Sequence, residues 1–334
     1  MNKIAIFLAA LGLNLLYSAA LASNLTIYTY DSFNSEWGPG PVVFKQFEKQ
    51  CQCTLKIVAL GDSGLMLNRI ILEKKNPQAD IFLGLNNSQL GKALSADIFV
   101  SYRSPNLADV NEEHWLDPQN RVTPFDYGFL AFVYDSEKIA EPPQSLQDLL
   151  KEEFKGKIVI EDPRTSSPGL TFLHWTISAF GEEGYLDYWE KLNPNLLAIT
   201  SGWSAAYGMF TKGEAPLVLS YATSPAYHLE HEKTDRFRAA LFARGHYKQV
   251  EGAGIVKGSR NPAMARQFID YMLSSEFQKE IPLKNWMFPV AKSQELPKSF
   301  SLAIHPDAVK SLDDRLILEK NSSWLKQWAR RLGN

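Results

Sequence analysis

Strand-like and helical segments alternate along this chain, and no other feature of the sequence limits the possible folds as strongly. Apolar runs at 25–30, 53–60 and 79–85 are each followed by a helical pattern. Strands that alternate with helices in this way predict an α/β fold with a mostly parallel sheet. Further strands are expected at 157–161, 196–199 and 215–221. Helices are expected at 41–50, 65–75, 88–95, 145–151, 168–180, 183–192, 203–212, 225–233, 261–273 and 322–332.

Two long extended runs, 122–135 and 246–258, interrupt this alternation. Two α/β halves joined by two extended crossings predict a discontinuous architecture of two lobes, with a ligand cleft between them. In α/β sheets the ligand binds at the carboxyl ends of the strands. We expect lobe 1 to comprise residues 23–124 and 250–290, and lobe 2 to comprise residues 125–249 and 291–334.

The first 22 residues have the pattern of a secretory signal peptide. Lys3 supplies a positive charge, an apolar run follows, and a small-residue cleavage motif ends at Ala22. The alternative is a membrane anchor, but the run is shorter than the ~20 residues that span a bilayer. We therefore expect cleavage after Ala22 and export of the mature protein. The formal net charge of −2 offers no electrostatic footprint for nucleic acid.

The two cysteines, Cys51 and Cys53, are separated by one residue. Because an exported protein meets an oxidising compartment, a disulfide between them is predicted. This bond requires a turn-like backbone at Gln52, since the two side chains of an extended strand lie near the upper limit for bridging. Free buried thiols are the alternative. No further Cys and no nearby His completes a ligand set, so no metal site is predicted.

Three helix entrances follow expected strands and carry hydroxyl or carboxyl groups. They contain Asp62 with Ser63, Ser167 before Pro168, and Ser224 before Pro225. Ordinary helix capping explains each of them taken alone, with Ser167 and Ser224 as the N-cap residues. Helix starts also present unpaired N–H groups, which suit an anion such as a phosphate. Because the three entrances follow strands, we expect them to converge on one cleft.

Aromatic side chains occupy several of the same loops. A cleft lined by aromatic planes suits a flat ring, and above all a cationic one. Trp203 and Trp286 follow turns, so we expect both in the cleft, where binding residues concentrate. Tyr30, Tyr221 and Tyr227 lie in the loops after their strands. By contrast, core packing is expected for four tryptophans that lie within helices: Trp175, Trp189, Trp324 and Trp328.

Several motifs of other protein classes are missing. The sequence contains neither a phosphate-binding G-x-x-x-x-G-K-[ST] loop nor a G-x-S-x-G nucleophile elbow. His228 and His231 share one predicted helix face, but no third ligand accompanies them, so a solvated helix surface is expected there. No catalytic residue and no cofactor is predicted.

Five segments, read together, resemble the family of bacterial periplasmic thiamine-binding proteins, which are the solute receptors of thiamine ABC importers. These segments are YTYDSFNSEWGPGP, DPRTSSPGL, SGWSAAYGMF, LVLSYATSPAYH and NWMFPV. The resemblance extends over essentially the whole mature chain, from Leu25 to the final helix. It implies a two-lobed type 2 periplasmic binding fold with two hinge crossings, periplasmic localisation and a receptor that is not an enzyme. It also implies an inner-membrane permease as partner. A monomer is expected, because such a receptor docks one permease.

The resemblance further implies thiamine, its monophosphate or its pyrophosphate as the transported ligand. It assigns ligand contacts to Asp62, Ser63, Ser166, Ser167, Trp203, Tyr221, Ala222, Thr223 and Ser224, and ring-enclosing positions to Tyr30, Tyr227 and Trp286. One departure concerns the aspartate. Relatives can carry Gly directly after it, whereas this chain has Ser63 and then Gly64.

Three alternatives remain open at this point. Ferric and polyamine receptors share the type 2 fold, but a ferric site requires clustered Tyr, carboxylate or His ligands, and polyamines require more carboxylates than these loops provide. A thiaminase resembles the same fold and cleaves thiamine with a cysteine nucleophile. That reaction requires a free cysteine that faces the cleft.

Overall fold

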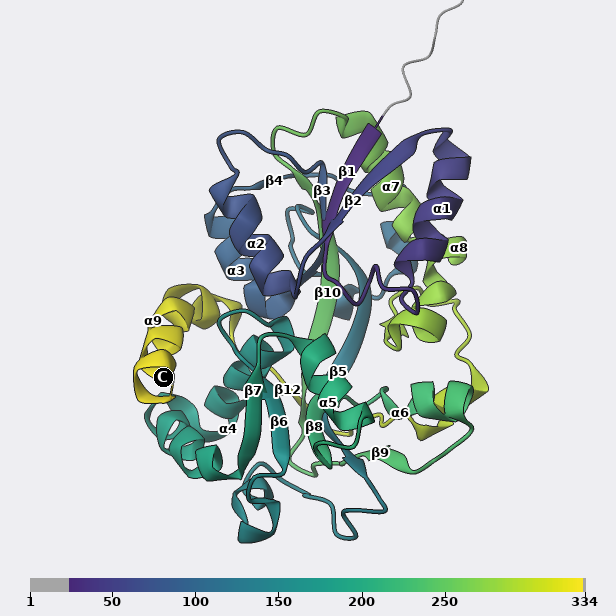
Figure 1. Cartoon of the computed structure of the whole chain (residues 1–334). Helices are drawn as coiled ribbons and strands as arrows, with labels where there is room; N and C mark the ends of the chain where they lie inside the picture. Colours follow the sequence, from purple (N-terminus) through teal and green to yellow (C-terminus); the bar gives the residue numbers. More distant parts are fainter. Residues whose placement is uncertain (1–23, 333–334) are drawn as a thin grey trace, which may run out of the picture.

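A computed structural model describes residues 24–332 of the chain (Figure 1). The expected signal peptide and its cleavage after Ala22 lie outside the described residues. Within the described range, no helix is both long enough and apolar enough to cross a membrane.

The first half contains three parallel strands in the order β2-β1-β3. Their bounds confirm the expected alternation: β1 (Asn24–Thr29), β2 (Thr54–Ala59) and β3 (Ile81–Asn86), with α1 (Gly40–Cys51), α2 (Ser63–Leu72) and α3 (Asn87–Ser95) after them. Ile27 is the register partner of both Ile57 and Ile81. These apolar strands pack against α1 and against α7 (Pro262–Met272), and together they form one hydrophobic core.

The second half repeats the arrangement with three parallel strands. These are β6 (Ile158–Glu161), β7 (Leu196–Thr200) and β8 (Leu217–Tyr221), with α4 (Ser167–Leu192) after β6 and α5 (Trp203–Thr211) after β7. A left-handed residue, Gly181 with φ of 74°, kinks α4 between the two helices expected at 168–180 and 183–192. The second core contains the four tryptophans expected there, Trp175, Trp189, Trp324 and Trp328.

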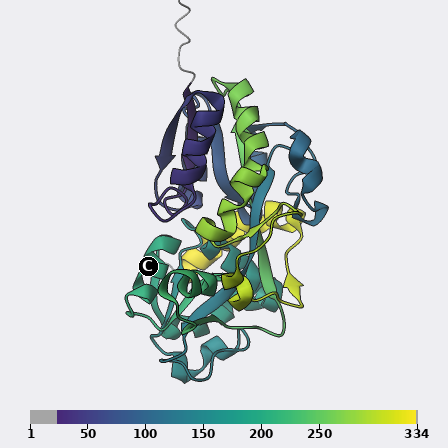
Figure 2. The same cartoon turned by 90° about the vertical axis from the view of Figure 1, so that its right-hand side faces the viewer.

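Two long strands cross between the halves: β5 (Thr123–Asp135) and β10 (His246–Val256). They pair with each other antiparallel, β10 also pairs antiparallel with β3, and β5 pairs antiparallel with β8. The sheet is therefore parallel only within each half, because the chain crosses once in each direction. Figures 1 and 2 show the two halves one above the other with these strands between them. The division of the chain into lobes at the expected residues stays a prediction.

The remaining elements are mostly short and join the halves or cover their edges. Helix α9 (Asp314–Leu332) begins earlier than expected and packs on α4. Two expected helices are wrong: 145–151 forms only the 3-10 turn η3 (Asp148–Leu150), and 225–233 divides into α6 (Pro225–Tyr227) and the π-turn η6 (His228–Glu232). The other strands and helices are β4 (Phe99–Val100), β9 (Phe237–Ala239), β11 (Phe288–Pro289), β12 (Val309–Lys310) and α8 (Ser275–Gln278), with 3-10 turns η1 (Pro105–Asp109), η2 (Glu112–His114), η4 (Glu152–Phe154), η5 (Asn193–Asn195) and η8 (Lys298–Leu302), and the π-turn η7 (Ile281–Asn285).

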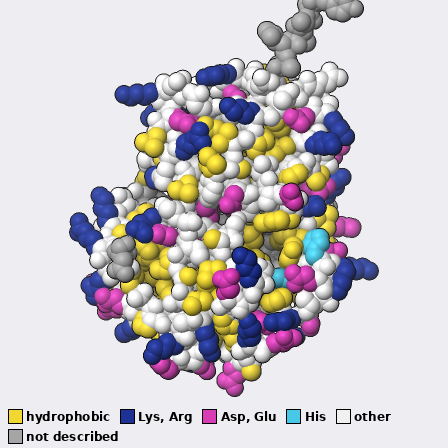
Figure 3. All heavy atoms as spheres, in the orientation of Figure 1, with side chains coloured by type: hydrophobic (Ala, Val, Ile, Leu, Met, Phe, Trp, Pro, Cys, Tyr) yellow, Lys and Arg dark blue, Asp and Glu magenta, His cyan; other side chains and the backbone are white. Residues whose placement is uncertain are grey.

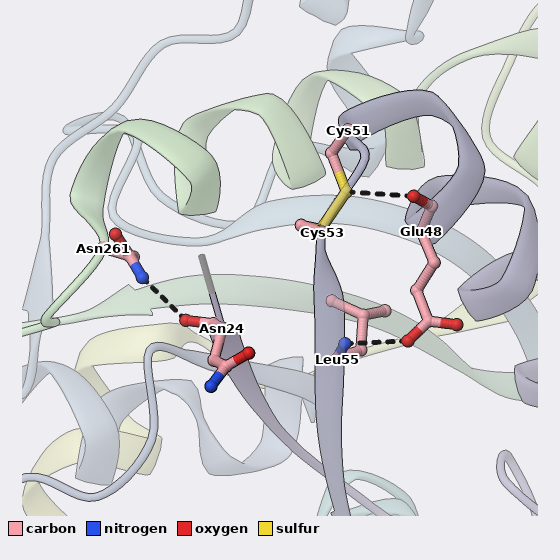
Figure 4. The surroundings of a disulfide bond; sticks show 6 residues. All are labelled: Asn24, Glu48, Cys51, Cys53, Leu55 and Asn261. Atoms are coloured by element: carbon pink, nitrogen blue, oxygen red, sulfur yellow. Dashed lines mark hydrogen bonds between the residues drawn. A yellow bond between two sulfur atoms is a disulfide. The ribbon is translucent and has the colours of Figure 1, made fainter. Parts of the chain in front are cut away.

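The predicted disulfide between Cys51 and Cys53 is present (Figure 4). The Cα atoms of the two cysteines are 5.2 Å apart. Gln52 adopts the left-handed conformation, with φ of 52° and ψ of 42°, which is the turn that the pairing requires. The disulfide thus fixes the passage from the end of α1 into β2, where the Leu55 amide also donates to Glu48 Oε1 at 2.8 Å.

Candidate ligand-binding site

A cavity of about 270 Å³ lies between the two halves, where the strands of both halves end. This volume is close to the lower end of the ~300–1,000 Å³ range of small-molecule pockets. Figure 3 shows hydrophobic side chains exposed on both halves of one face of the molecule. The residues that line the cavity are Tyr30, Ser32, Trp37, Asp62, Ser167, Pro168, Trp203, Ser204, Tyr207, Gly208, Thr211, Tyr221, Ser224, Tyr227, Glu251, Asn285, Trp286 and Met287.

One aromatic wall is built on the first turns of α5. The Trp203 ring stacks on Tyr207, with ring centroids 4.7 Å apart and planes 16° apart. Its indole N–H donates to Ser220 Oγ at 2.8 Å, so the ring is held on its edge as well as on its face. Trp37, which is 45% exposed, approaches Trp203 from the other half at a centroid distance of 6.0 Å. The two halves therefore meet at the rim of the cavity through aromatic contact.

A second aromatic wall comes from α6 and from the end of η7. The rings of Tyr227 and Trp286 lie edge to face, with centroids 5.4 Å apart. Trp286 has a left-handed backbone, with φ of 56°, which turns the chain back after η7. This is an uncommon conformation for a bulky residue. Uncommon backbone conformations concentrate at binding sites, so this conformation favours a role for Trp286 in ligand binding rather than in core packing alone.

Asp62 joins the two halves at the other end of the cavity. Its carboxylate accepts hydrogen bonds from the Ser167 amide at 2.8 Å, from Ser166 Oγ at 3.0 Å and from the Trp203 amide at 3.3 Å. The starts of α4 and α5 therefore converge on this carboxylate. Of the three helix entrances predicted to converge, Asp62 joins its own to that of Ser167, whereas the Ser224 entrance makes no hydrogen bond to it. Burial raises the pKa of Asp62, although these hydrogen bonds oppose the shift.

One of the two predicted N-caps is wrong, and the other makes no capping hydrogen bond through its side chain. The N-cap of α4 is Ser166, which accepts from the Gly169 amide, and Ser167 is the first helical residue. Ser224 is the N-cap of α6, as predicted, but α6 is a single short turn and the Ser224 side chain makes no capping hydrogen bond. Its hydroxyl instead lies 2.8 Å from Ser220 Oγ and accepts from the Tyr221 amide. Ser224 thus tightens the turn after β8.

Most of the predicted binding residues surround the cavity: Tyr30, Asp62, Ser167, Trp203, Tyr221, Ser224, Tyr227 and Trp286. Four others do not line it. Ser63 donates to Gln89 Oε1 at 2.9 Å inside the first half, and Ser166 is turned toward Asp62. Ala222 and Thr223 are fully buried behind the wall. Any ligand contact of these four would go through the backbone or require movement.

Sequence reasoning missed the floor of the cavity, which Glu251 and Asn285 form. Glu251 Oε2 accepts from the Tyr30 hydroxyl at 2.8 Å, and Oε1 accepts from Gln249 Nε2 at 2.9 Å. Asn285 Nδ2 donates to Asp126 Oδ2 at 2.6 Å. Glu251 and Asp126 are register partners on β10 and β5. The available signal was an acidic residue in the interior of each crossing strand, Asp126 in β5 and Glu251 in β10.

The electrostatic character of the cavity is acidic. Burial raises the pKa of Glu251 to about 7. Burial and the neighbouring Glu251 raise the pKa of Asp126 well above its usual range. No Lys, Arg or His is among the described residues that line the cavity. The site is therefore suited to a small ligand with flat rings and positive charge.

His228 is not on a solvated helix surface, contrary to the sequence prediction. Its side chain is fully buried because η6 turns it toward α5. Nε2 lies 2.8 Å from the Tyr207 hydroxyl, and Nδ1 lies 2.8 Å from Glu232 Oε2. His228 therefore supports Tyr207, on which the Trp203 ring stacks. Across residues 24–332, no group of three His, Cys, Asp or Glu side chains is placed to hold a metal ion.

The sequence also matches the model of a known family, described as bacterial extracellular solute-binding protein, over residues 76–308. This match covers more than half of the chain. The chain belongs to this family. Its members are solute-binding proteins rather than enzymes, and the two-lobed α/β architecture of this solute-binding protein agrees with that assignment.

Individual relatives are similar over nearly the full length. The chain is 44% identical over 306 residues to the thiamine-binding periplasmic protein of Escherichia coli, which covers 92% of each chain. It is 42% identical over 317 residues to the protein of the same name from Brucella abortus, covering 93% of this chain and 92% of the other. A solved structure of a periplasmic thiamin-binding protein superposes with a TM-score of 0.89 at 42% identity, covering 95% of this solute-binding protein and 98% of that chain.

Proposed function

We propose that this protein is a periplasmic receptor that captures thiamine between its two halves and delivers it to an inner-membrane ABC importer. The names of the full-length relatives support the ligand and the compartment. Thiamine combines an aminopyrimidine ring with a permanently cationic thiazolium ring. Both parts match a cavity that presents aromatic faces and acidic groups.

The observation that carries this proposal is the pairing of aromatic walls with a floor that lacks basic side chains. Trp203, Tyr221, Tyr227 and Trp286 offer ring faces or edges to the cavity. A desolvated cation–π contact contributes up to ~2 kcal/mol, whereas micromolar to nanomolar affinity requires ~8–12 kcal/mol. The remainder must come from polar contacts and from closure of the halves around the ligand.

We infer that the phosphate esters of thiamine also bind, with the ester directed at Asp62. The amides of Ser167 and Trp203 and the Ser166 hydroxyl already converge there on one anionic group. An ester that reaches these donors would take the place of the Asp62 carboxylate as their acceptor. The pyrophosphate should bind less tightly than the monophosphate, since no basic side chain offsets its additional charge.

The alternatives receive less support from the site. A ferric receptor requires a cluster of metal ligands, and a cysteine-dependent thiaminase requires a free thiol in the cavity. Cys51 and Cys53 are joined to each other, and neither lines the cavity. We further propose that the receptor acts as a monomer, because one importer engages one loaded receptor.

A tryptophan-fluorescence titration of ligand-stripped mature protein tests the proposal. Thiamine, its monophosphate, its pyrophosphate and spermidine are titrated in parallel. We expect quenching that saturates below micromolar thiamine, weaker binding of the pyrophosphate and no response to spermidine. Folded protein that responds to spermidine but not to thiamine would contradict the proposed ligand.

A further inference from the structure

The cavity contains buried acidic side chains, and none of its described lining residues carries a positive charge that would balance them. Glu251 and Asp62 line it, and Asp126 lies beside Glu251 on the neighbouring strand. All three side chains are at most 8% exposed. A buried carboxylate without a cationic partner is strongly disfavoured, so such a group either takes up a proton or is stabilised by a cation that binds next to it.

The hydrogen bonds distinguish the two carboxyl groups at the floor. Asp126 accepts from Asn285 through Oδ2, while its buried Oδ1 has no partner. This arrangement fits a protonated, neutral Asp126. Glu251 accepts through both oxygens, from Tyr30 and from Gln249, and this favours its ionised form. Glu251 is therefore the group of the pair that can change charge near neutral pH, and it also faces the cavity.

None of the groups that face Glu251 carries a positive charge that could balance its negative charge. Asp126 faces it from β5, Asp62 from the turn before α2, Tyr30 from the loop after β1, and Tyr221 from the end of β8. Each of these is acidic or phenolic. A positive charge in the cavity can thus come only from the ligand, as far as the described lining residues are concerned.

We propose that Glu251 supplies the negative charge that holds the cationic ring of the ligand, and that it releases a proton to solvent when the ligand binds. The proposal rests on the proposed function, because it takes the ligand to carry a thiazolium cation. The carboxyl O–H bond breaks, the proton goes to water or buffer, and the cation takes its place as the balancing charge.

Two consequences follow from this coupling. Affinity for thiamine should fall as the pH decreases, by up to about tenfold per pH unit below pH 7, because binding must then displace a proton. An isostere in which a thiophene replaces the thiazolium ring carries no charge. It should bind without releasing a proton, and its Kd should be independent of pH over the same range.

Isothermal titration calorimetry in buffers of different ionisation enthalpy measures the released protons directly. At pH 6.5 we expect between about 0.5 and 1 proton per thiamine from the wild type and none from Glu251→Gln. We also expect Glu251→Gln to weaken thiamine binding at least tenfold at pH 8. Equal proton release by Glu251→Gln and wild type would overturn the proposal.

Glu161→Gln is the matched control. Glu161 is also a fully buried carboxylate, but it does not line the cavity, and neither of its oxygens has a hydrogen-bond partner to lose. It should release as many protons as the wild type. If proton release disappears in Glu161→Gln and persists in Glu251→Gln, the group that loses the proton is Glu161 and not Glu251. That result would overturn the proposal.

The neutral isostere keeps the test independent of the folding of any variant. If the wild type releases protons equally with thiamine and with the isostere, proton release does not depend on the positive charge of the ring, and the proposal fails. If the wild type binds thiamine without releasing protons, the receptor function stands and only this proposal fails. If folded wild type does not bind thiamine at all, the proposed function itself fails.

Discussion

At Asp62, one buried carboxylate connects segments that are more than 100 residues apart. It lies in the turn between β2 and α2, whereas its donors, Ser166, Ser167 and Trp203, belong to the second half. Hydrogen bonds to a charged group contribute about 1.5–3 kcal/mol each when buried. Asp62 therefore favours the closed arrangement of the halves, in which the cavity is formed.

Replacing Asp62 with Asn should weaken ligand binding about 10- to 100-fold, because the amide cannot accept from all three donors: with its oxygen toward Ser166 and Trp203, its NH₂ group faces the Ser167 N–H. The fluorescence titration with thiamine measures this change. Asp31→Asn is the control, since Asp31 also connects the halves, through Ser204 Oγ at 2.8 Å, but in an exposed position. An effect of Asp31→Asn as large as that of Asp62→Asn would show that burial is not the deciding factor.

At the scale of elements, α9 is the C-terminal helix that covers α4. Trp328 packs edge to face on Trp189 with centroids 5.4 Å apart, and His174 Nε2 lies 3.0 Å from Asn321 Oδ1. Because an amide oxygen only accepts, Nε2 carries the proton, and the buried Nδ1 is left without a partner. Burial lowers the pKa of His174 to about 4.

This depressed pKa predicts a specific loss of stability in acid. Unfolded His174 takes up a proton near pH 6.5, whereas the folded residue stays neutral down to about 4. Its contribution is therefore complete above pH 6.5 and is lost as the pH falls toward 4, by up to ~3 kcal/mol. In urea unfolding from pH 7 to 4, His174→Gln should lose less stability than the wild type. Equal pH dependence in both would contradict the assignment, and exposed His305→Gln serves as the control.

The disulfide at the end of α1 should matter little for the site. It closes a loop of only three residues, so the entropic model gives about 2 kcal/mol or less. The double variant Cys51→Ala/Cys53→Ala should unfold at a slightly lower urea concentration, with an unchanged Kd for thiamine. A large loss of binding in folded double variant would indicate that the cysteines participate in the site.

Local sequence patterns were sufficient for the alternating elements and for the loops at the strand ends. Ser before Pro predicted the start of α4 to within one residue, and Gly with an aromatic predicted Trp203 at the start of α5. The floor could not be predicted in this way. Glu251 and Asp126 meet only because β10 and β5 pair in a particular register, and that register depends on contacts between distant segments.

At the scale of the whole molecule, the two crossing strands connect the halves, and one of them also contributes to the binding cavity. Glu251 of the cavity floor lies on β10, which runs through both halves, whereas Asn285 of the floor belongs to η7 and the walls come from α5, α6 and the residue after η7. A ligand that contacts the floor and both walls must favour the closed arrangement. The ligand thus stabilises the form of the receptor that encloses it.

A crystal structure of the protein with thiamine tests the central claim most directly. We expect the two rings of thiamine in the cavity between the halves, enclosed by Trp203, Tyr221, Tyr227 and Trp286, with the cationic ring next to Glu251. Thiamine bound outside this cavity, or a fully occupied ligand whose cationic ring points away from Glu251 and the aromatic walls, would contradict the account.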